Sequence, residues 1–473
     1  MLTVFERSEK GRSAFTLPKS KVKVYPIANE FLSQKETILP EVSEIDIVRH
    51  YTELSGKAFG VDNGFYPLGS CTMKYNPKIN EAVAALDGFT TAHPLSEERY
   101  VQGTLELLYK TAERLKAITG MDEISLQPAA GAHGEYLGLK LIKAYHLDRN
   151  DTKRVNIIVP DSAHGTNPAS ATLCGFNIIN IPSYADGSVD LEALALACND
   201  TVAGLMLTNP NTLGKFDKNI VDITNIVHNA GGLCYYDGAN LNAIMGIVRP
   251  GDMGFDVIHT NLHKTFSTPH GGGGPGSGPV GVKAFLKDFL PDGGIAFDGK
   301  NYSLYTPKKT IGKVKAFFGN IGVIIKAYTY MLILGREGIK DAAEKAVLNA
   351  NYLKALLKDI DYKCNEHCMH EFVLSMEDMK KEYNVSALDI AKAMIDHGIH
   401  PPTMYFPLIV HEALMFEPTE TENKQTLDNA AKVILEIIEQ AKKEPENMHF
   451  TPYNAYISRP DEVLAARNPI LKI

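Results

Sequence analysis

The stretch Asn261-Leu262-His263-Lys264-Thr265-Phe266-Ser267 follows the apolar run Phe255 to Ile258 and precedes the glycine-rich residues Gly271 to Gly274. It places a lysine at the end of a predicted buried strand. An ammonium group is costly there, because it loses its hydration and its pKa falls. A lysine with a depressed pKa is the kind of amine that forms a Schiff base with an aldehyde. A surface lysine beside a flexible loop is the alternative, and three further segments argue against it.

The first of these segments is an aspartate at a strand end. The apolar run Gly232 to Tyr236 is followed directly by Asp237. A carboxylate at this position could keep the pyridine nitrogen of a cofactor protonated, so that the charged ring accepts electrons from a carbanion. By itself the signal is weak, since an aspartate after a strand is often a turn residue or a helix cap.

The second segment, Ser125 to Glu135, leads from a predicted strand through small residues into the helical pattern Tyr136 to Tyr145. Small residues let backbone N–H groups approach a phosphate, and the start of the helix adds a partial positive charge. An ordinary turn between strand and helix would have the same composition. The third segment, Pro160 to Pro168, follows the apolar run Val155 to Val159 and places His164 where an imidazole could stack on an aromatic ring.

These four strand ends occur in the order phosphate turn, stacking histidine, ring-nitrogen carboxylate and amine, which resembles pyridoxal-phosphate enzymes of fold type I, the aspartate-aminotransferase fold. Longer motifs resemble one family, the P-protein of the glycine cleavage system. They are Phe65 to Pro77, Gln127 to Ala132, Asp161 to Pro168, Thr208 to Gly214, Pro401 to Pro407 and Glu417 to Glu422. Some members fuse two homologous halves. The present chain is similar to the lysine-bearing half, which is subunit 2 of the two-subunit glycine dehydrogenase (decarboxylating).

The resemblance implies a role for each matching residue. Lys264 would hold pyridoxal 5'-phosphate, Asp237 would keep its ring protonated and His164 would stack on one ring face; these three are the predicted catalytic residues. The remaining predicted cofactor contacts are Ala239 on the other ring face, Ala130, Gly131, Ala132 and His263 around the phosphate, and Thr208 and Asn240 near the ring oxygen or the substrate. Weaker candidates are Thr265, and Gly319-Asn320 reaching in from a neighbouring subunit. No metal site is predicted.

The resemblance also implies an activity and partners. The activity is decarboxylation of glycine, in glycine catabolism, with transfer of the aminomethyl group to the lipoyl arm of the H-protein, whose disulfide is reduced. The implied partners are glycine, the lipoylated H-protein and glycine dehydrogenase subunit 1, in a heterotetramer with two copies of each subunit. Two alternatives stay open: another fold type I decarboxylase, lyase or aminotransferase acting on a free amino acid, and a non-catalytic assembly subunit. A scaffold has no need of Lys264, Asp237 and His164 together.

The order of apolar strands and helical patterns along the chain predicts its architecture. Short apolar strands alternate with helical patterns between residues 65 and 335, which indicates a mostly parallel sheet covered on both faces. The predicted strands are Glu123 to Leu126, Val155 to Val159, Asn177 to Ile181, Ala203 to Thr208, Leu233 to Tyr236, Val257 to Thr260 and Val280 to Val282. We therefore expect an N-terminal arm (1–64), a large cofactor-binding α/β domain (65–335) and a small C-terminal α+β domain (336–473). Ligands of such sheets gather beyond the carboxyl ends of the strands.

Helical patterns complete this prediction. Ile321 to Leu334 reads as a buried helix that is too short to span a bilayer. A long helix at Asp341 to Leu357 and a shorter one at Ala387 to His397 should follow. A final helix should pack inward through one apolar stripe. This stripe consists of Leu427, Ala430, Ala431, Ile434, Ile437, Ile438 and Ala441.

Composition narrows the function class. The chain has 473 residues, 44% of them hydrophobic, and a formal charge of −8, which gives no bulk attraction for nucleic acid. The N-terminal residues lack the apolar core of an export signal, so we expect a cytoplasmic protein, with its six cysteines reduced. The segment Cys364 to His370 contains possible metal ligands in a spacing that fits no familiar zinc motif. Gly276 to Gly281 matches a dinucleotide pattern but lacks the strand before it, and is interpreted as a lead into the strand Val280 to Val282.

Overall fold

The computed structural model describes the chain except residues 1, 15–16, 36–37, 164, 185–186, 270–275, 361–366 and 471–473. The chain forms two compact units, Met1–Asn63 and Gly64–Ile473. In the first unit, a short 3-10 helix η1 (Asn29–Phe31) precedes α1 (Glu44–Ser55). Helix α1 begins where it does because the Ser43 side chain accepts from the Asp46 amide while the Asp46 side chain accepts from the Ser43 amide.

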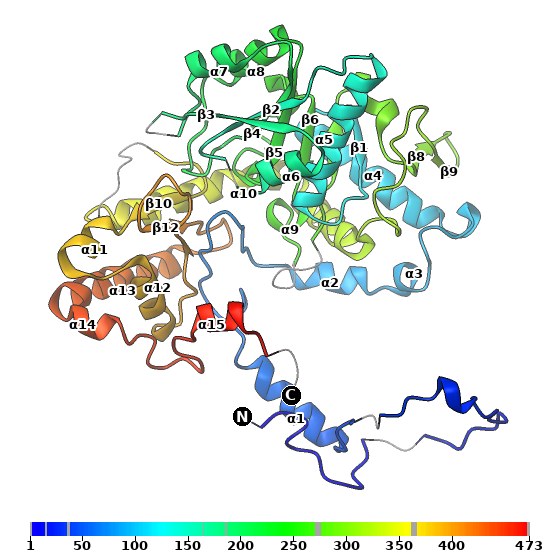
Figure 1. Cartoon of the computed structure of the whole chain (residues 1–473), viewed down its shortest axis with the longest axis vertical. Helices are drawn as coiled ribbons and strands as arrows, with labels where there is room; N and C mark the ends of the chain where they lie inside the picture. The colour runs from blue at the N-terminus through cyan, green and yellow to red at the C-terminus, as the bar shows by residue number, and fades with distance from the viewer. Residues whose placement is uncertain are drawn as a thin grey trace. The chain divides into compact units, whose positions relative to one another are not determined.

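A seven-stranded sheet forms the centre of the second unit (Figure 1). Its strands are β1 (Glu123–Ser125), β2 (Asn156–Pro160), β3 (Asn177–Ile181), β4 (Val202–Thr208), β5 (Leu233–Gly238), β6 (Val257–Thr260) and β7 (Val280–Val282). The order across the sheet is β1-β7-β6-β5-β4-β2-β3, and β7 runs antiparallel to both of its neighbours while the other strands are parallel. This confirms the predicted α/β class, and each predicted strand lies within two residues of an observed one.

Both faces of the sheet are covered. Successive side chains of a strand point to opposite faces, so Ile158 joins one core while Ile157 and Val159 join another. Helices α4 (Gln102–Thr119), α7 (Leu191–Ala197), α8 (Ile220–Asn229) and the first part of α10 (Ile321–Leu356) contribute to the first core. Helices α5 (Gly131–Asp148) and α6 (Thr166–Leu173) contribute to the second.

Helix α10 has the predicted break between two helices. The backbone of Gly335, with a φ of 63° and a ψ of −170°, is not helical and separates the two parts, directly after the predicted end of the first helix at Leu334. The prediction of a buried first part is only partly correct, because Leu332 and Ile333 are exposed. No helix within the described residues is both long enough and apolar enough to cross a membrane.

A second, smaller sheet lies toward the C-terminus, in the order β10-β12-β11, with all pairs antiparallel. It comprises β10 (Phe372–Ser375), β11 (Thr403–Met404) and β12 (Ala413–Phe416), with helices α11 (Glu377–Tyr383), α12 (Ala387–Asp396), α13 (Lys424–Lys443), α14 (Pro445–Met448) and α15 (Glu462–Arg467). The predicted stripe of α13 is buried throughout, but α13 is not the final helix. Phe65 belongs to the core of this region, and Leu68 bridges to Phe416. The predicted domain boundaries stay a prediction.

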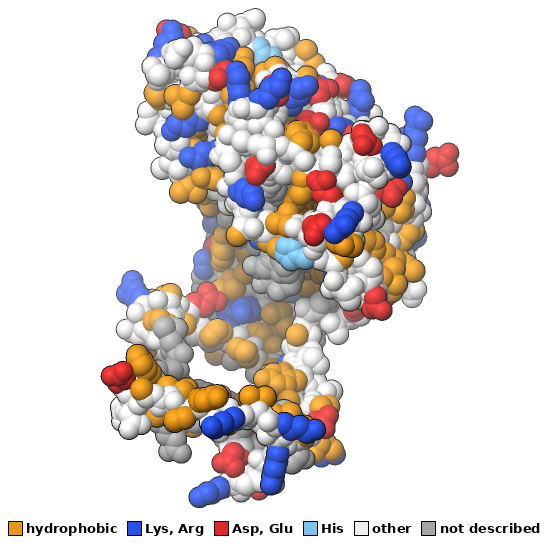
Figure 2. All heavy atoms as spheres, turned by 90° about the vertical axis from the view of Figure 1, so that its right-hand side faces the viewer, with side chains coloured by type: hydrophobic (Ala, Val, Ile, Leu, Met, Phe, Trp, Pro, Cys, Tyr) orange, Lys and Arg blue, Asp and Glu red, His pale blue; other side chains and the backbone are white. Residues whose placement is uncertain are grey.

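The remaining elements connect these layers. They are α2 (Lys78–Ala84), α3 (Asp87–Thr90), η2 (Glu98–Tyr100), η3 (Leu241–Ala243), η4 (Pro250–Met253), α9 (Leu262–Thr265), η5 (Ala284–Phe289) and the hairpin of β8 (Gly294–Phe297) and β9 (Tyr302–Tyr305). Figure 2 shows acidic and basic side chains interspersed with apolar ones on the face in view. All five described cysteines are free thiols.

A buried ion pair joins distant parts of the second unit. Lys74 Nζ lies 2.7 Å from Glu420 Oε1, and their side chains are 1% and 8% exposed. The same ammonium donates to the Thr265 carbonyl at 3.0 Å and lies over the ring of Tyr330. Burial lowers the pKa of Lys74, but the charge and hydrogen bond of Glu420, together with Tyr330 and Glu417, outweigh burial and the pKa is raised. Residues from the segment after Leu68, from α9, from α10 and from the segment after β12 therefore meet at one cation.

We predict that Lys74→Met destabilises the fold by about 3–5 kcal/mol, because it leaves the Glu420 carboxylate buried without its counter-charge. Urea unfolding monitored by circular dichroism measures this change. The double variant Lys74→Met/Glu420→Gln should recover part of the loss. Lys153→Met is the matched control, since its pair with Asp200 is exposed and solvated. A Lys74→Met protein as stable as the Lys153→Met control would contradict this assignment.

Candidate functional site

A cavity of about 240 Å³ lies where the carboxyl ends of β4, β5 and β6 meet the start of α5. Eight of the predicted site residues line it: Gly131, Ala132, Thr208, Asp237, Ala239, Asn240, His263 and Lys264. They come from segments far apart in sequence. The topology brings them together, because parallel strands present their carboxyl ends at the same edge of a sheet.

Two other predicted positions, Ala130 and Thr265, do not line the cavity. Ala130 is the residue before α5, and its carbonyl oxygen packs against Gly278, where an added Cβ would lie 2.0 Å away. Thr265 is fully buried in α9 and does not face the cavity. His164 lies outside the described residues, so its stacking role stays a prediction.

The Lys264 amine is held by a backbone carbonyl. After β6 the chain enters the short helix α9, which carries Lys264 into the cavity. Its Nζ donates to the carbonyl oxygen of Ser70 at 2.7 Å. Ser70 has a φ of 63°, in the left-handed region that a residue with a side chain rarely adopts. A strained turn in the N-terminal motif therefore presents its carbonyl to this amine.

Asp237 is buried at the end of β5 and surrounded by donors. One carboxylate oxygen accepts from Asn167 Nδ2 at 3.0 Å, and the other accepts from the Ala239 amide at 3.0 Å. His259 Nε2 lies 3.5 Å from the second oxygen. Burial raises the pKa of Asp237, but His259, these hydrogen bonds and Lys264 outweigh it, so the pKa is lowered overall. The carboxylate is thus kept ionised inside the protein.

A tyrosine sets the orientation of His259. The Tyr235 hydroxyl and His259 Nδ1 are 2.6 Å apart, and both side chains are fully buried. Burial raises the pKa of Tyr235 well above its usual range, so the phenol stays protonated and shares this hydrogen bond with Nδ1. This arrangement provides the cavity with a fixed anion.

The turn before α5 is braced by its neighbours. The Ala129 amide donates to His133 Nδ1 at 3.1 Å, and the Gly278 amide donates to the Pro128 carbonyl at 2.9 Å. Asn320 Nδ2 donates to the Ala129 carbonyl at 3.0 Å within the same chain. The predicted contribution of Gly319-Asn320 across a subunit boundary stays a prediction. Helix α5 has 18 residues, and its amino end faces the cavity, as an anion site requires.

Two buried polar atoms in the cavity wall indicate that the cavity accepts a polar ligand. Within the described part of the chain, Thr208 Oγ1 and Asn261 Oδ1 have no hydrogen-bond partner. A buried polar group without a partner is costly, so such atoms in a functional cavity point to a ligand that completes them. A phosphorylated aromatic aldehyde fits the set: an amine for the aldehyde, a helix start for the phosphate and a carboxylate for a ring nitrogen.

Six further residues line the cavity without having been predicted: Ser70, Glu135, Thr166, Thr212, His259 and Asn261. Glu135 accepts from Thr166 Oγ1 at 2.8 Å and from Ser170 Oγ at 2.7 Å, which ties α5 to α6. Ser70, Glu135, Thr166 and Thr212 lie within segments quoted in the sequence analysis, so their positions there could have been used to predict them. His259 gave no such signal, because a histidine inside an apolar strand reads as part of the core.

Two further segments discussed in the sequence analysis are wholly or partly described by the structure. Gly276 to Gly281 leads into β7 as predicted. Of the segment Cys364 to His370, residues 364–366 lie outside the described part, while Cys368 and His370 are buried.

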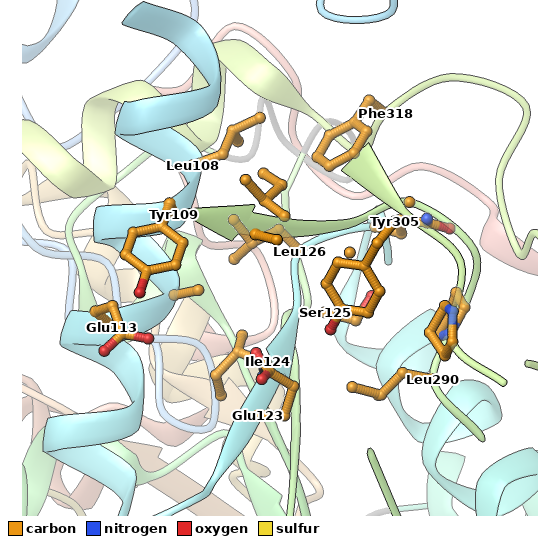
Figure 3. A pocket seen from close by; sticks show the side chains of 18 of the residues that line it. Leu108, Tyr109, Glu113, Glu123, Ile124, Ser125, Leu126, Leu290, Tyr305 and Phe318 are labelled. Atoms are coloured by element: carbon orange, nitrogen blue, oxygen red, sulfur yellow. Dashed lines mark hydrogen bonds between the residues drawn. The ribbon is translucent and has the colours of Figure 1, made fainter. Parts of the chain in front are cut away.

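A second pocket of about 260 Å³ lies between α4, β1 and the β8–β9 hairpin, where Tyr109 and Tyr305 lie on opposite sides (Figure 3). It contains neither Lys264 nor Asp237.

Comparison with known proteins identifies the family. Residues 342–457 match the family model "Glycine dehydrogenase, C-terminal domain". The chain is 60% identical to the probable glycine dehydrogenase (decarboxylating) subunit 2 of Caldanaerobacter subterraneus subsp. tengcongensis, over 99% of this chain and 98% of that one. It is 56% identical to the protein of the same name from Thermotoga petrophila, over 100% and 99% of the two chains.

A solved structure has the same fold. It is the inhibitor-bound glycine decarboxylase (P-protein) of the glycine cleavage system, with a TM-score of 0.72 and 19% identity, covering 87% of this chain and 93% of that one. The predicted fold type I architecture is thereby confirmed. Because full-length relatives share more than half of its residues, the chain belongs to the family of glycine dehydrogenase (decarboxylating) subunit 2.

Proposed function

We propose that this protein binds pyridoxal 5'-phosphate in the cavity at Lys264 and catalyses the decarboxylation of glycine. The observation that carries the proposal is the convergence of a lysine amine, a buried ionised aspartate and a helix start on one cavity. When bound, pyridoxal phosphate supplies an electron sink for the pair of electrons left behind when the glycine carboxylate departs as carbon dioxide. Family membership supports glycine as the amino acid.

The protein's residues would hold this group from all sides. The Nζ of Lys264 binds the aldehyde, and Asp237 holds a proton on the ring nitrogen, a role supported by its lowered pKa. The amides of Gly131 and Ala132 at the start of α5, together with His263, bind the phosphate. Thr208 donates its free hydroxyl to the ring oxygen or the substrate, and Asn240 also lines the cavity there as a second candidate for these contacts. His164 and Ala239 cover the two ring faces.

The complete reaction needs partners. We propose that the aminomethyl group passes to the lipoyl arm of the H-protein, whose disulfide is reduced, and that this chain acts together with glycine dehydrogenase subunit 1. The name of its relatives, subunit 2, supports a partner subunit. A heterotetramer with two copies of each subunit in the cytoplasm is the assembly that we infer.

The direct test is exchange of labelled bicarbonate into the carboxyl group of glycine, which measures reversible decarboxylation. Purified protein is assayed with lipoylated H-protein, with and without subunit 1. We expect exchange that requires both partners. If the protein binds pyridoxal phosphate and yet shows no exchange in either condition, it acts on another amino acid and the proposal fails.

The role of Lys264 predicts where the cofactor is attached. Borohydride reduction after incubation with pyridoxal phosphate should label one peptide of the wild-type protein, that of Lys264, and peptide mapping by mass spectrometry identifies it. Lys264→Ala should remove the label, whereas Lys153→Ala at the exposed Lys153 should retain it. Labelling of a different lysine in the wild-type protein would refute the assignment.

The role of Asp237 predicts a loss of turnover without loss of the cofactor. Asp237→Asn should keep the absorbance of the bound cofactor but lower the bicarbonate exchange rate by at least about 100-fold, because an amide cannot hold the ring proton. Asp256→Asn is the matched control. It changes an equally buried aspartate just before β6, which accepts from the Cys234 amide away from the cavity. An exchange rate close to that of the wild type in Asp237→Asn would exclude this role.

A further inference from the structure

Two buried glutamates stand behind the cavity, and the proposed chemistry assigns them no role. Glu371 directly precedes β10 and Glu417 directly follows β12. Phe372 and Phe416 pair across these antiparallel strands, so the two carboxyl groups come from neighbouring ends of the small sheet. Their exposed fractions are 0% and 1%. Buried carboxyl groups are rare unless hydrogen bonds or charges compensate them, so their partners indicate what they do.

Both oxygens of Glu371 accept hydrogen bonds from the cavity wall. One accepts from the Ser70 amide at 3.0 Å, and the other accepts from Asn240 Nδ2 at 3.1 Å. Ser70 and Asn240 line the cavity, whereas Glu371 does not. The carbonyl oxygen of the same Ser70 accepts from Lys264 Nζ. One residue therefore links the carboxyl group of Glu371 to the amine of Lys264.

The turn that contains Ser70 depends on such contacts. Its left-handed backbone conformation is strained and persists only where the surroundings impose it. The preceding Gly69 donates its amide to the Met415 carbonyl at 3.1 Å, and its own carbonyl accepts from Thr403 Oγ1 at 2.6 Å. A Cβ at Gly69 would lie 2.3 Å from the Met415 side chain, so the turn fits closely against β12. The small sheet thus fixes the turn on one side and Glu371 fixes it on the other.

We propose that Glu371 is a positioning residue for Lys264: its carboxyl group fixes the Ser70 peptide, whose carbonyl oxygen then holds the Lys264 amine in the cavity. The inference deepens the proposed function and rests on it, because the amine must be held where the cofactor's aldehyde arrives. Glu371 acts through Ser70 and Asn240 and does not contact the substrate itself.

Glu417 provides a matched comparison within the same cluster. A single oxygen of Glu417 accepts from both Thr72 Oγ1 and Asn242 Nδ2. Glutamine can retain both of these bonds through its one carbonyl oxygen. At Glu371 the two donors lie on different oxygens, so Glu371→Gln must turn an amide nitrogen toward an N–H donor. The same chemical change thus breaks a hydrogen bond at one site and spares both at the other.

The charges of the two sites can also be matched. Burial raises the pKa of Glu417 to about 7 and that of Glu371 well above its usual range. At pH 6 the Glu417 carboxyl group is therefore mostly protonated, the pKa of Glu371 is shifted in the same direction, and glutamine makes the same chemical change at both sites. His370 lies beside them, with Nε2 3.7 Å from Glu371 and 4.0 Å from Glu417, and burial lowers its pKa to about 3, so it is neutral at this pH.

The test measures cofactor capture separately from cofactor binding. Full-length protein in complex with subunit 1, freed of cofactor, is mixed at pH 6 with pyridoxal phosphate, and absorbance records the rate of attachment to Lys264. Pyridoxine 5'-phosphate, which has the ring and the phosphate but no aldehyde, measures affinity for the cavity by calorimetry. We expect Glu371→Gln to slow attachment about tenfold or more, because the amine is misplaced, and to change the pyridoxine phosphate affinity less than twofold. Glu417→Gln should attach the cofactor at nearly the wild-type rate.

Other results would overturn the inference. Attachment at the wild-type rate in Glu371→Gln would show that the amine does not depend on this carboxyl group. Equal loss of attachment and of pyridoxine phosphate affinity would indicate a general structural role, and equal slowing in Glu417→Gln would assign the effect to the cluster as a whole. If Glu371→Gln does not fold, Gly69→Ala, which must displace the same turn, should slow attachment alone, and an unchanged rate refutes the inference. Absence of attachment to Lys264 in the wild type would instead refute the proposed function.

Discussion

The buried ion pair between Lys74 and Glu420 is the contact on which the arrangement of the second unit depends. An ammonium group inside a protein is tolerable only when a counter-charge and further acceptors replace its water shell. Glu420 supplies the charge and Thr265 the additional acceptor, next in sequence to Lys264. The segment after the small sheet's β12, the N-terminal motif and helix α9, which carries Lys264, are thereby held together at one point. Replacing either charged residue alone would leave the other charge uncompensated in the interior. The pair therefore favours the arrangement in which the N-terminal motif, α9 and the segment after β12 meet.

The carboxyl groups on the two sides of the cavity have pKa values that are shifted in opposite directions. The large sheet contributes a carboxylate, Asp237, that donors keep ionised although it is buried. The small sheet contributes two carboxyl groups, Glu371 and Glu417, whose pKa values burial raises. Each of these deeply buried groups accepts two hydrogen bonds, so the difference lies in the neighbouring charges: His259 and Lys264 lower the pKa of Asp237, whereas the charge of Glu417 raises that of Glu371. Lys264 lies between these environments, with one ionised carboxylate and two carboxyl groups that favour the neutral form.

The sequence predicted the large sheet well because each strand was a short apolar run bounded by turn residues, and parallel strands bring their following residues to one edge. Lys264, Asp237 and the turn before α5 could be placed for this reason. Ser70 and Glu371 could not be placed by strand-end reasoning, because Ser70 reaches the cavity, and Glu371 supports it from behind, from segments that belong to the small sheet and its neighbours.

The position of the bound cofactor tests the proposed site most directly. A crystal structure of the protein with subunit 1, grown with pyridoxal phosphate, should reveal continuous density from Lys264 Nζ to the cofactor. An oxygen of Asp237 should lie within hydrogen-bond distance of the ring nitrogen, and the phosphate should lie at the start of α5. A cofactor attached to another residue, or a ring nitrogen facing away from Asp237, would contradict the central claim that these three strand ends form the site.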